Sequence, residues 1–194
     1  MNLKNAIAIT GGISSGKSSV CSLLRLYGYS IIDADEIAHS ALNLLKDEVV
    51  LEFGDEILDS NNNIDRKKLG SIVFCDTKKR KILENILHPF IKNEILKKAQ
   101  DLEQYKKNYF VDIPLFFEAK EKYPIERILL IYTPREIQLE RLMKRDHINI
   151  DLALKKIESQ MDIESKIALS SYIIDNSKDL SHLQSQVESF LKTL

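Results

Sequence analysis

The sequence predicts an α/β fold in which a parallel five-stranded sheet lies between layers of helices. Short apolar runs of strand length alternate with longer segments of helical periodicity, and this alternation is typical of parallel sheets with helices on both faces. A glycine-rich loop follows the first run, at the end of a strand, where open α/β sheets gather their ligands. The expected strands cover residues 6–9, 29–33, 109–113, 127–132 and 172–175.

Composition restricts the class of protein. The chain has 194 residues and 44% hydrophobic content, enough for one large core with a small inserted lobe. Its formal net charge is -1, which argues against nucleic acid or an anionic membrane as a partner. Cys21 and Cys75 have neither redox nor metal spacing, and Cys21 is expected to be a small buried side chain. Without a signal segment or a membrane-length apolar run, we expect a cytoplasmic protein.

The loop from Gly11 to Ser18 matches the phosphate-binding pattern G-x-x-x-x-G-K-[S/T] at every fixed position. Its glycines allow backbone N–H groups to turn toward phosphates, and the helix that follows adds a partial positive charge. Lys17 is expected to bridge the β- and γ-phosphates of ATP, and the Ser18 hydroxyl to bind Mg²⁺. An ordinary glycine-rich turn is the alternative. The expected ATP-binding residues here are Gly11, Gly12, Ile13, Ser14, Ser15, Gly16, Lys17, Ser18 and Ser19.

Helical periodicity dominates residues 36–104. Gly28 is expected to end the helix after the phosphate loop, and Asp65 and Asp76 are plausible N-caps of two further helices. Pro89 is expected to interrupt the helical run and to start a new helix. This long insertion between strands is where we expect a substrate-binding lobe.

The C-terminal half continues the alternation. Thr133 and Pro134 are expected to cap a helix that runs to about Arg145, and another helix is expected after Asp151. A terminal amphipathic helix follows the last strand and carries apolar residues at helical spacing.

Two carboxylates lie at expected strand ends. Asp33 is suited to accept the proton of an attacking hydroxyl, or to orient that hydroxyl. Its alternative role is to cap the next helix, for which Asp35 is better placed. Asp112 is suited to hold Mg²⁺, to cap the turn before Pro114, or to contact the substrate, and its position alone leaves these three roles open.

Arg141 and Arg145 are four residues apart and therefore project from one face of their expected helix. Two guanidinium groups so arranged are suited to close over a polyphosphate. The alternative is a solvated charged face, because Glu136, Glu140 and Lys144 lie nearby.

Taken together, several segments resemble the dephospho-coenzyme A kinase family, in order and spacing over nearly the whole chain. The D-A-D and P-L-x-F-E segments make the resemblance much more specific than the phosphate loop alone. The matching segments are Ile9 to Ser18, Asp33-Ala34-Asp35, His88-Pro89, Asp112 to Glu118 and Ile174-Asp175-Asn176.

The resemblance implies an activity and a set of regions. It implies ATP-dependent phosphorylation of the ribose 3′-hydroxyl of dephospho-coenzyme A, the last step of coenzyme A synthesis, with Mg²⁺. It also implies a P-loop kinase three-layer fold in a single domain, as a monomer or small homo-oligomer. The expected regions are a core at about 1–35, 106–140 and 168–194, a helical substrate-binding region at about 36–105, and a lid at about 141–167.

The resemblance also assigns residues. Asn176 resembles the loop beside adenine, although a simple turn after the last strand is the alternative. The catalytic residues implied are Asp33, Lys17, Arg141 and Arg145; Ser18 and Asp112 are implied for the metal; and the substrate-binding residues implied are Asp33, Asp35, His88, Leu115, Phe117 and Glu118.

Three other functions compete with this interpretation. Another small-molecule kinase would share the fold and differ only in its acceptor. A GTPase is disfavoured because the sequence has no Asn/Thr-Lys-x-Asp segment that reads guanine. A sensor that binds ATP without transferring phosphate would need neither Asp33 nor the arginine pair.

Overall fold

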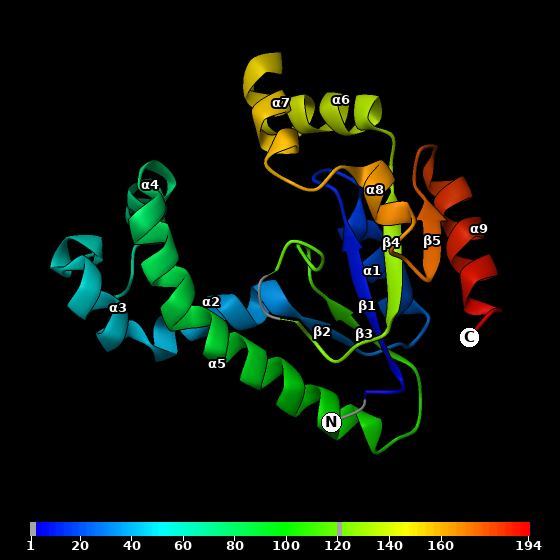
Figure 1. Ribbon diagram of the computed structural model, residues 1–194, viewed down its shortest axis with the longest axis horizontal. Coiled ribbons are helices and arrows are strands. Elements are labelled where there is room, and N and C mark those ends of the chain that lie inside the picture. Colours follow the sequence, from blue (N-terminus) through cyan, green and yellow to red (C-terminus); the bar gives the residue numbers. More distant parts are fainter. Residues whose placement is uncertain (1–2, 120–121) are drawn as a thin grey trace. The chain divides into compact units, whose positions relative to one another are not determined.

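The computed structural model describes residues 3–119 and 122–194, and its centre is a five-stranded sheet with the order β2-β3-β1-β4-β5 (Figure 1). Strand β1 pairs in parallel with β3 and β4, and β4 pairs in parallel with β5, so the predicted fold class is confirmed. All five expected strands are present, and β2 is shorter than expected. Their bounds are β1 (Ala6–Gly11), β2 (Ile31–Asp33), β3 (Tyr109–Asp112), β4 (Arg127–Tyr132) and β5 (Tyr172–Asp175).

Helices cover the sheet because its strands are apolar on both faces. Every residue of β1 is buried, as in a parallel sheet between helical layers. Helices α1 (Lys17–Leu26) and α9 (Leu180–Leu191) share a core with the sheet, while α8 (Ile163–Ile167) contacts β4 and lies in front of the sheet in Figure 1. Phe110 of β3 makes an edge-to-face contact with Tyr29 at 5.4 Å. The shared core contains Ile7, Ile9, Val20, Leu24, Phe110, Leu129, Ile131, Ile174, Leu183, Val187 and Phe190.

Helices α6 (Arg135–Asp146) and α7 (Ile150–Glu158) form a hairpin before α8. Of the expected capping pair Thr133-Pro134, Pro134 is the N-cap of α6, and no side chain caps the first turn by a hydrogen bond. Helix α7 begins before Asp151, because Asn149, two residues before Asp151, caps the helix by accepting from Leu152 N–H through Oδ1. His147 ends α6 in the left-handed conformation, with φ of 53°.

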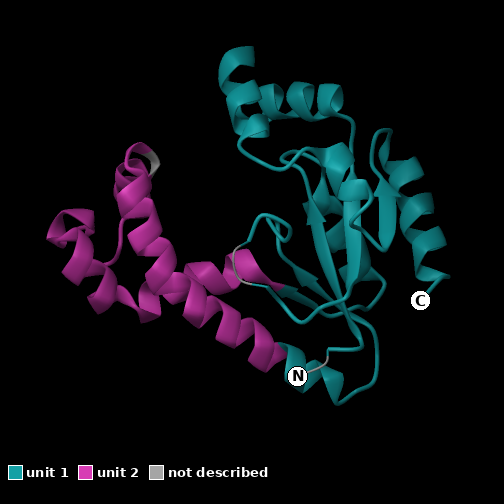
Figure 2. Ribbon diagram, viewed as in Figure 1, with its two compact units in different colours: residues 1–32, 99–194 teal, residues 33–98 magenta. Residues whose placement is uncertain are grey.

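The chain divides into two compact units (Figure 2). The first unit contains residues 1–32 and 99–194, and the second unit contains residues 33–98. The second unit is helical and has its own apolar core, made by Val49, Phe53, Ile57, Ile64 and Leu69. Its elements are α2 (Ala34–Leu44), α3 (Lys46–Phe53), η1 (Asp55–Ile57), α4 (Arg66–Cys75) and most of α5 (Thr77–Glu103).

Helix α5 continues through Pro89, so the expected interruption is wrong. Proline lacks the N–H that would bond to the carbonyl of Asn85, but both residues are exposed and water can reach that carbonyl. Leu87, Ile91 and Ile95 are buried at helical spacing on both sides of Pro89. Burial of this stripe outweighs the loss of one backbone hydrogen bond.

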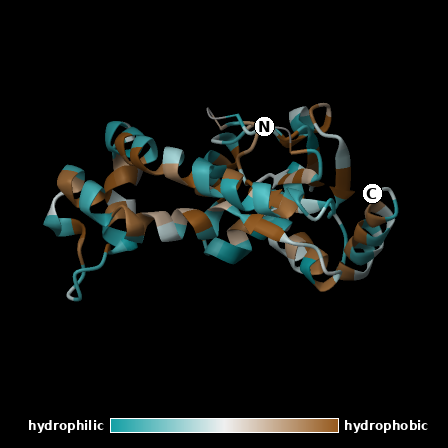
Figure 3. Ribbon diagram, turned by 90° about the horizontal axis from the view of Figure 1, so that it is seen from below, coloured by the Kyte–Doolittle hydropathy of each residue, from teal (hydrophilic) through white to brown (hydrophobic). Residues whose placement is uncertain are grey.

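Three predictions of helix boundaries are confirmed, at Asp65, Asp76 and Gly28. Asp65 Oδ1 accepts from the N–H groups of the first turn of α4, and Asp76 Oδ1 does the same for α5. Gly28 follows α1 with φ of 84°, as expected of a helix stop. Figure 3 shows hydrophobic and hydrophilic residues on the same helices, as amphipathic helices require. Of the helices in the described part of the chain, none has the length and apolar character needed to cross a bilayer.

Candidate active site

The phosphate loop connects β1 to α1 and needs its glycines for two different reasons. Gly16 has φ of 81°, which side chains other than glycine rarely adopt. Gly12 packs so tightly that a Cβ there would lie 2.5 Å from Gln138 Oε1. The hydroxyls of Ser14 and Ser15 are buried and lack hydrogen-bond partners among the described residues. The loop therefore presents polar atoms that a ligand can satisfy.

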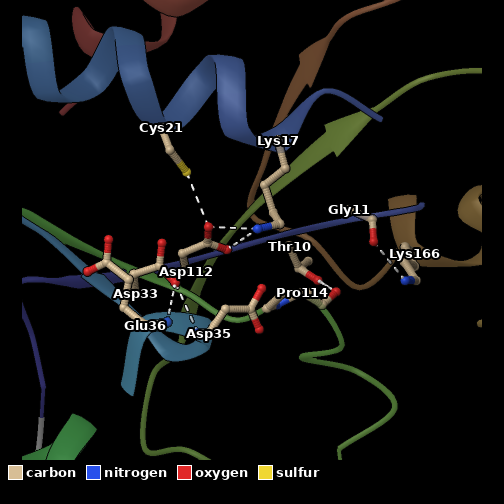
Figure 4. A network of polar contacts seen from close by, with 10 residues as sticks. All are labelled: Thr10, Gly11, Lys17, Cys21, Asp33, Asp35, Glu36, Asp112, Pro114 and Lys166. Carbon is tan, nitrogen blue, oxygen red and sulfur yellow. Dashed lines mark hydrogen bonds and ion pairs between the residues drawn. The ribbon is translucent and has the colours of Figure 1, made fainter. Parts of the chain in front are cut away.

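Lys17 reaches from the first turn of α1 to the end of β3 (Figure 4). Its Nζ lies 2.5 Å from Asp112 Oδ1 and 2.6 Å from Oδ2. The pairing register puts Ile9 opposite Asp112, so the carboxylate lies beside the strand that leads into the loop. Asp112 is buried, and a buried carboxylate needs such a partner. The structure thus joins two sequence-predicted residues that are 95 positions apart.

Cys21 lies one turn after Lys17 and completes this group. Its Sγ is 3.4 Å from Asp112 Oδ2, and its side chain is buried as expected. Burial, with the Asp112 carboxylate as a smaller cause, raises the pKa of the Cys21 thiol to about 12. The Cys21 side chain is therefore a neutral thiol at physiological pH.

Two side chains after other strands hold the middle of the phosphate loop. Asn176 Nδ2 donates to the carbonyl of Ser15 at 2.8 Å, and Thr133 Oγ1 donates to the same carbonyl at 3.1 Å. Both residues are buried. Asn176 was assigned to the nucleotide site from sequence, whereas Thr133 was assigned only to helix capping. The position of Thr133 directly after β4 could have indicated a place in the nucleotide site, because the carboxyl ends of parallel strands lie at one edge of the sheet.

An open pocket of about 300 Å³ lies beside the start of α1. Arg141 and Asn176 both line it, so the structure brings these two predicted residues to the same side of the phosphate loop. The volume is at the lower end of small-ligand sites. Gly16, Ser19, Lys178, Asp179, Leu180 and Leu183 complete the lining.

Arg145 has a different environment from Arg141, although both are on α6. It is exposed, and its Nε lies 2.8 Å from Asp146 Oδ1. Lys156 of α7 contacts the other oxygen of Asp146 at 2.8 Å. Hydrogen bonds from these two cations lower the pKa of Asp146 to about 2. Arg145 therefore takes part in the α6–α7 hairpin in this structure.

The segment after β3 carries three predicted substrate residues. Leu115 is exposed, and Phe117 is half-buried against Phe116 in an edge-to-face contact of 5.7 Å. Thr10 Oγ1 donates to the carbonyl of Pro114 at 2.9 Å and ties the segment to β1. Glu118 turns inward to Lys166, with 2.7 Å between Oε1 and Nζ.

Sequence reasoning missed several polar residues around the loop. Lys166 is fully buried, and the sequence around it does not distinguish it from the many surface lysines. Gln138 is also buried, and its Nε2 donates to the carbonyl of Thr133 at 2.6 Å. Gln160 bonds to the loop backbone at Ile13. These contacts depend on tertiary structure, so no local pattern indicated them.

The remaining predicted residues belong to the second unit. Asp33 is the last residue of β2 and the N-cap of α2: its Oδ1 accepts from Asp35 N–H at 3.0 Å and Glu36 N–H at 3.2 Å. The expectation that Asp35 caps this helix is wrong, because Asp35 already lies within the first turn whereas Asp33 has the extended backbone of an N-cap. His88 is exposed on α5.

The fold and the phosphate loop together define a class, the P-loop kinases. A shikimate kinase from Acinetobacter baumannii shares the fold with a TM-score of 0.53 at 16% sequence identity, and the similarity covers 97% of this chain and 92% of that one.

More similar proteins identify the family. A family model described as dephospho-CoA kinase matches residues 5–182. A dephospho-CoA kinase of Helicobacter pylori strain J99 is 51% identical over 196 residues, covering 100% of each chain. The solved structure of a dephospho-CoA kinase from Campylobacter jejuni has a TM-score of 0.79 and 35% identity, covering 97% of this chain and 96% of that one. The chain belongs to the dephospho-CoA kinase family.

Proposed function

We propose that this protein transfers the γ-phosphoryl group of ATP to the ribose 3′-hydroxyl of dephospho-CoA, which yields CoA and ADP in the final step of CoA biosynthesis. One observation carries the proposal: a complete phosphate loop with Lys17 at its helix, in a chain that matches the dephospho-CoA kinase family over residues 5–182. The 51% identity to a curated dephospho-CoA kinase over the whole chain supports the same acceptor.

ATP binding is assigned to the phosphate loop and its neighbours. The N-terminus of α1, with its backbone N–H groups and partial positive charge, is assigned to the phosphates. Lys17 is assigned to the β- and γ-phosphates, which compete with Asp112 for its charge when ATP binds. The adenine is assigned to the side of the loop where Asn176 and Arg141 line the open pocket.

Asp33 is assigned as the catalytic base, which accepts the proton of the attacking 3′-hydroxyl or orients it. Its hydrogen bonds from the N–H groups of Asp35 and Glu36 fix the orientation of the carboxylate. A helix N-terminus stabilises a negative charge at this position. The role in capping and the role in catalysis are therefore compatible.

The residues present fit Mg²⁺ bound together with ATP. Magnesium in kinases keeps several waters and takes one or two protein oxygens besides the phosphates. Ser18 is exposed directly after Lys17, and Asp112 provides a carboxylate at the end of β3. Bound Mg²⁺ would neutralise charge on the β- and γ-phosphate oxygens. Among the described residues there is no cluster of three or more His, Cys, Asp or Glu, and a nucleotide-bound Mg²⁺ does not require one.

The other roles proposed for this chain concern substrate contacts and closure. Arg141 and Arg145 are assigned to the polyphosphate, in a lid at about 141–167, and closure of that lid would exclude water. Cytoplasmic location and a monomeric or small homo-oligomeric state stay predictions. Contacts with dephospho-CoA are assigned to the helical region at about 36–105 and to Asp33, Asp35, His88, Leu115, Phe117 and Glu118, the last through Oε2, since Oε1 already contacts Lys166.

The test is ADP formation by the purified protein with Mg-ATP, with and without dephospho-CoA. We expect ADP only when the acceptor is present, and a product whose mass has increased by one phosphoryl group. Shikimate and a nucleoside serve as control acceptors. ADP formation with a control acceptor but not with dephospho-CoA would indicate a different small-molecule kinase. ATP binding without ADP formation from any acceptor would indicate a sensor.

A further inference from the structure

Three polar side chains outside the phosphate-binding pattern hold the first half of the loop. Lys166 is fully buried in α8, and its Nζ donates to the carbonyl oxygen of Gly11 at 3.2 Å (Figure 4). Gln160, between α7 and α8, accepts from Ile13 N–H at 2.8 Å through Oε1. Glu118 contacts Lys166, with 2.7 Å between Oε1 and Nζ. We call Glu118, Gln160 and Lys166 the loop brace.

The brace restrains the two peptide planes on either side of Gly12. The carbonyl group of Gly11 belongs to the plane before Gly12, and the N–H group of Ile13 belongs to the plane after it. Rotation about φ or ψ of Gly12 would break one of the two hydrogen bonds. Lys166 and Gln160 therefore restrict both dihedrals of a residue that has no Cβ to limit them.

Glu118 aligns the other two members of the brace. Its Oε1 faces Lys166 and also accepts from Met161 N–H at 3.0 Å, next to Gln160 in the chain. A fully buried lysine charge is costly without such a partner. The carboxylate thus balances the charge of Lys166 and holds the turn that carries Gln160.

We propose that Gln160 and Lys166, aligned by Glu118, are positioning residues that keep Gly12 in its ATP-binding conformation before ATP arrives. The proposal rests on the phosphate loop being the ATP site. Without the brace, the bond from Ser15 N–H to the Gly12 carbonyl at 3.1 Å is left to hold the second of these planes, and Gly12 becomes fully ordered only when ATP binds. The backbone entropy of one residue corresponds to a loss of about 5- to 30-fold in ATP affinity.

Gln160→Met is the primary test, because it removes the acceptor of Ile13 N–H at similar volume and the site is only half-buried. Gln186→Met, at a half-buried glutamine of α9, is the matched control. Calorimetry with Mg-ATP should show affinity reduced about 5- to 30-fold for Gln160→Met only. Amide hydrogen exchange in residues 12–15 should become faster in the free variant, while β1 and β4 stay protected.

Unchanged ATP affinity and unchanged exchange in Gln160→Met would overturn the brace while leaving the proposed function in place. Failure of the wild-type protein to bind ATP would overturn the proposed function, and the brace with it. The two failures are therefore distinguishable.

The Lys166–Glu118 pair provides a second test. Lys166→Met should lower the melting temperature because it leaves the half-buried Glu118 without its charge partner. Adding Glu118→Gln should restore much of the melting temperature but not the ATP affinity, since the Gly11 carbonyl still lacks its donor. Recovery of both would show that Lys166 acts only on stability, and would overturn its positioning role. If Lys166→Met does not fold, the double variant and Gln160→Met decide the proposal.

Discussion

The two units of the chain use their polar side chains in different ways. In the first unit, contacts join residues far apart in the sequence: Lys17 and Asp112 are 95 positions apart, and Lys166 and Gly11 are 155 positions apart. In the second unit, the Asp65 carboxylate bonds to backbone N–H groups two and three positions along the chain. Long-range contacts build the phosphate site, whereas such local ones cap helices.

This difference predicts different effects of substitutions in the two units. Loss of a helix cap costs about 1 kcal/mol and leaves the chemistry unchanged. Loss of a preorganised charged group at a phosphate site reduces turnover by orders of magnitude. Asp33 is the informative exception, because it has the capping geometry of the second unit and a proposed role in catalysis.

Lys17→Ala should give the largest effect. It removes the charge proposed to contact the β- and γ-phosphates, and kcat/KM should fall at least about 10³-fold with much weaker ATP binding. Lys67→Ala, at an exposed lysine of the second unit, is the control and should leave turnover unchanged. Steady-state kinetics and ATP titration provide the measurements. Normal ATP affinity in Lys17→Ala would remove the basis for assigning the chemistry to the first unit.

Asp33→Asn should reduce kcat by about 10²- to 10⁴-fold and leave ATP affinity nearly unchanged, because it removes a base while asparagine still caps α2. Asp65→Asn is a matched control: its carboxylate caps α4 with distances of 2.9 and 3.2 Å, against 3.0 and 3.2 Å for Asp33. Both variants should melt near the wild-type temperature. If Asp33→Asn has the kcat of the wild type, Asp33 acts only as a helix cap, as Asp65 does.

The arginines of α6 allow a finer distinction within the first unit. Arg141→Gln should weaken ATP binding about 10- to 100-fold, as expected for loss of a charged hydrogen bond, because Arg141 lines the open pocket. Arg145→Gln should have a smaller effect, confined to kcat, since Arg145 must leave Asp146 before it can reach a phosphate. Lys144→Gln, exposed on the same helix, is the control. Equal kinetics for all three variants would favour a solvated charged face.

Alkylation of cysteine should have the smallest effect on activity, and the two thiols should differ clearly in their reactivity. The thiolate is the reactive form, and a pKa of about 12 keeps Cys21 protonated at pH 8. Cys75, exposed in the second unit, should be alkylated by iodoacetamide, while Cys21 should stay unmodified and activity should be retained. Peptide mass spectrometry locates the modification. Rapid alkylation of Cys21 would contradict its buried position beside Asp112.

Much of the fold was predictable because its signals are local. Five apolar runs identified the strands, and the loop pattern placed β1 and α1 in sequence. The continuity of α5 through Pro89 was not predictable, because the buried stripe that includes Leu87 and Ile91 outweighs the local preference of proline. Capping by Asp33 was only the alternative to capping by Asp35, because the expected helix start was misplaced by two residues.

The site was predictable where a motif or a strand end marks it. Lys17 and Asp112 were both identified before the structure showed their contact. Lys166 and Gln160 were missed, because burial and distant partners give them their roles and their local sequence resembles any lysine-rich helix. Contacts between residues so far apart in the chain leave no periodic pattern in the sequence from which they could be predicted.

The position of the transferred phosphate tests the central claim most directly. The protein is incubated with Mg-ATP and dephospho-CoA, and the purified product is examined by phosphorus and proton NMR to locate the new phosphomonoester on the ribose. The account predicts a single product phosphorylated at the 3′-hydroxyl, in amounts equal to the ADP formed. A product phosphorylated elsewhere, or ADP formed without phosphorylation of the acceptor, would contradict it.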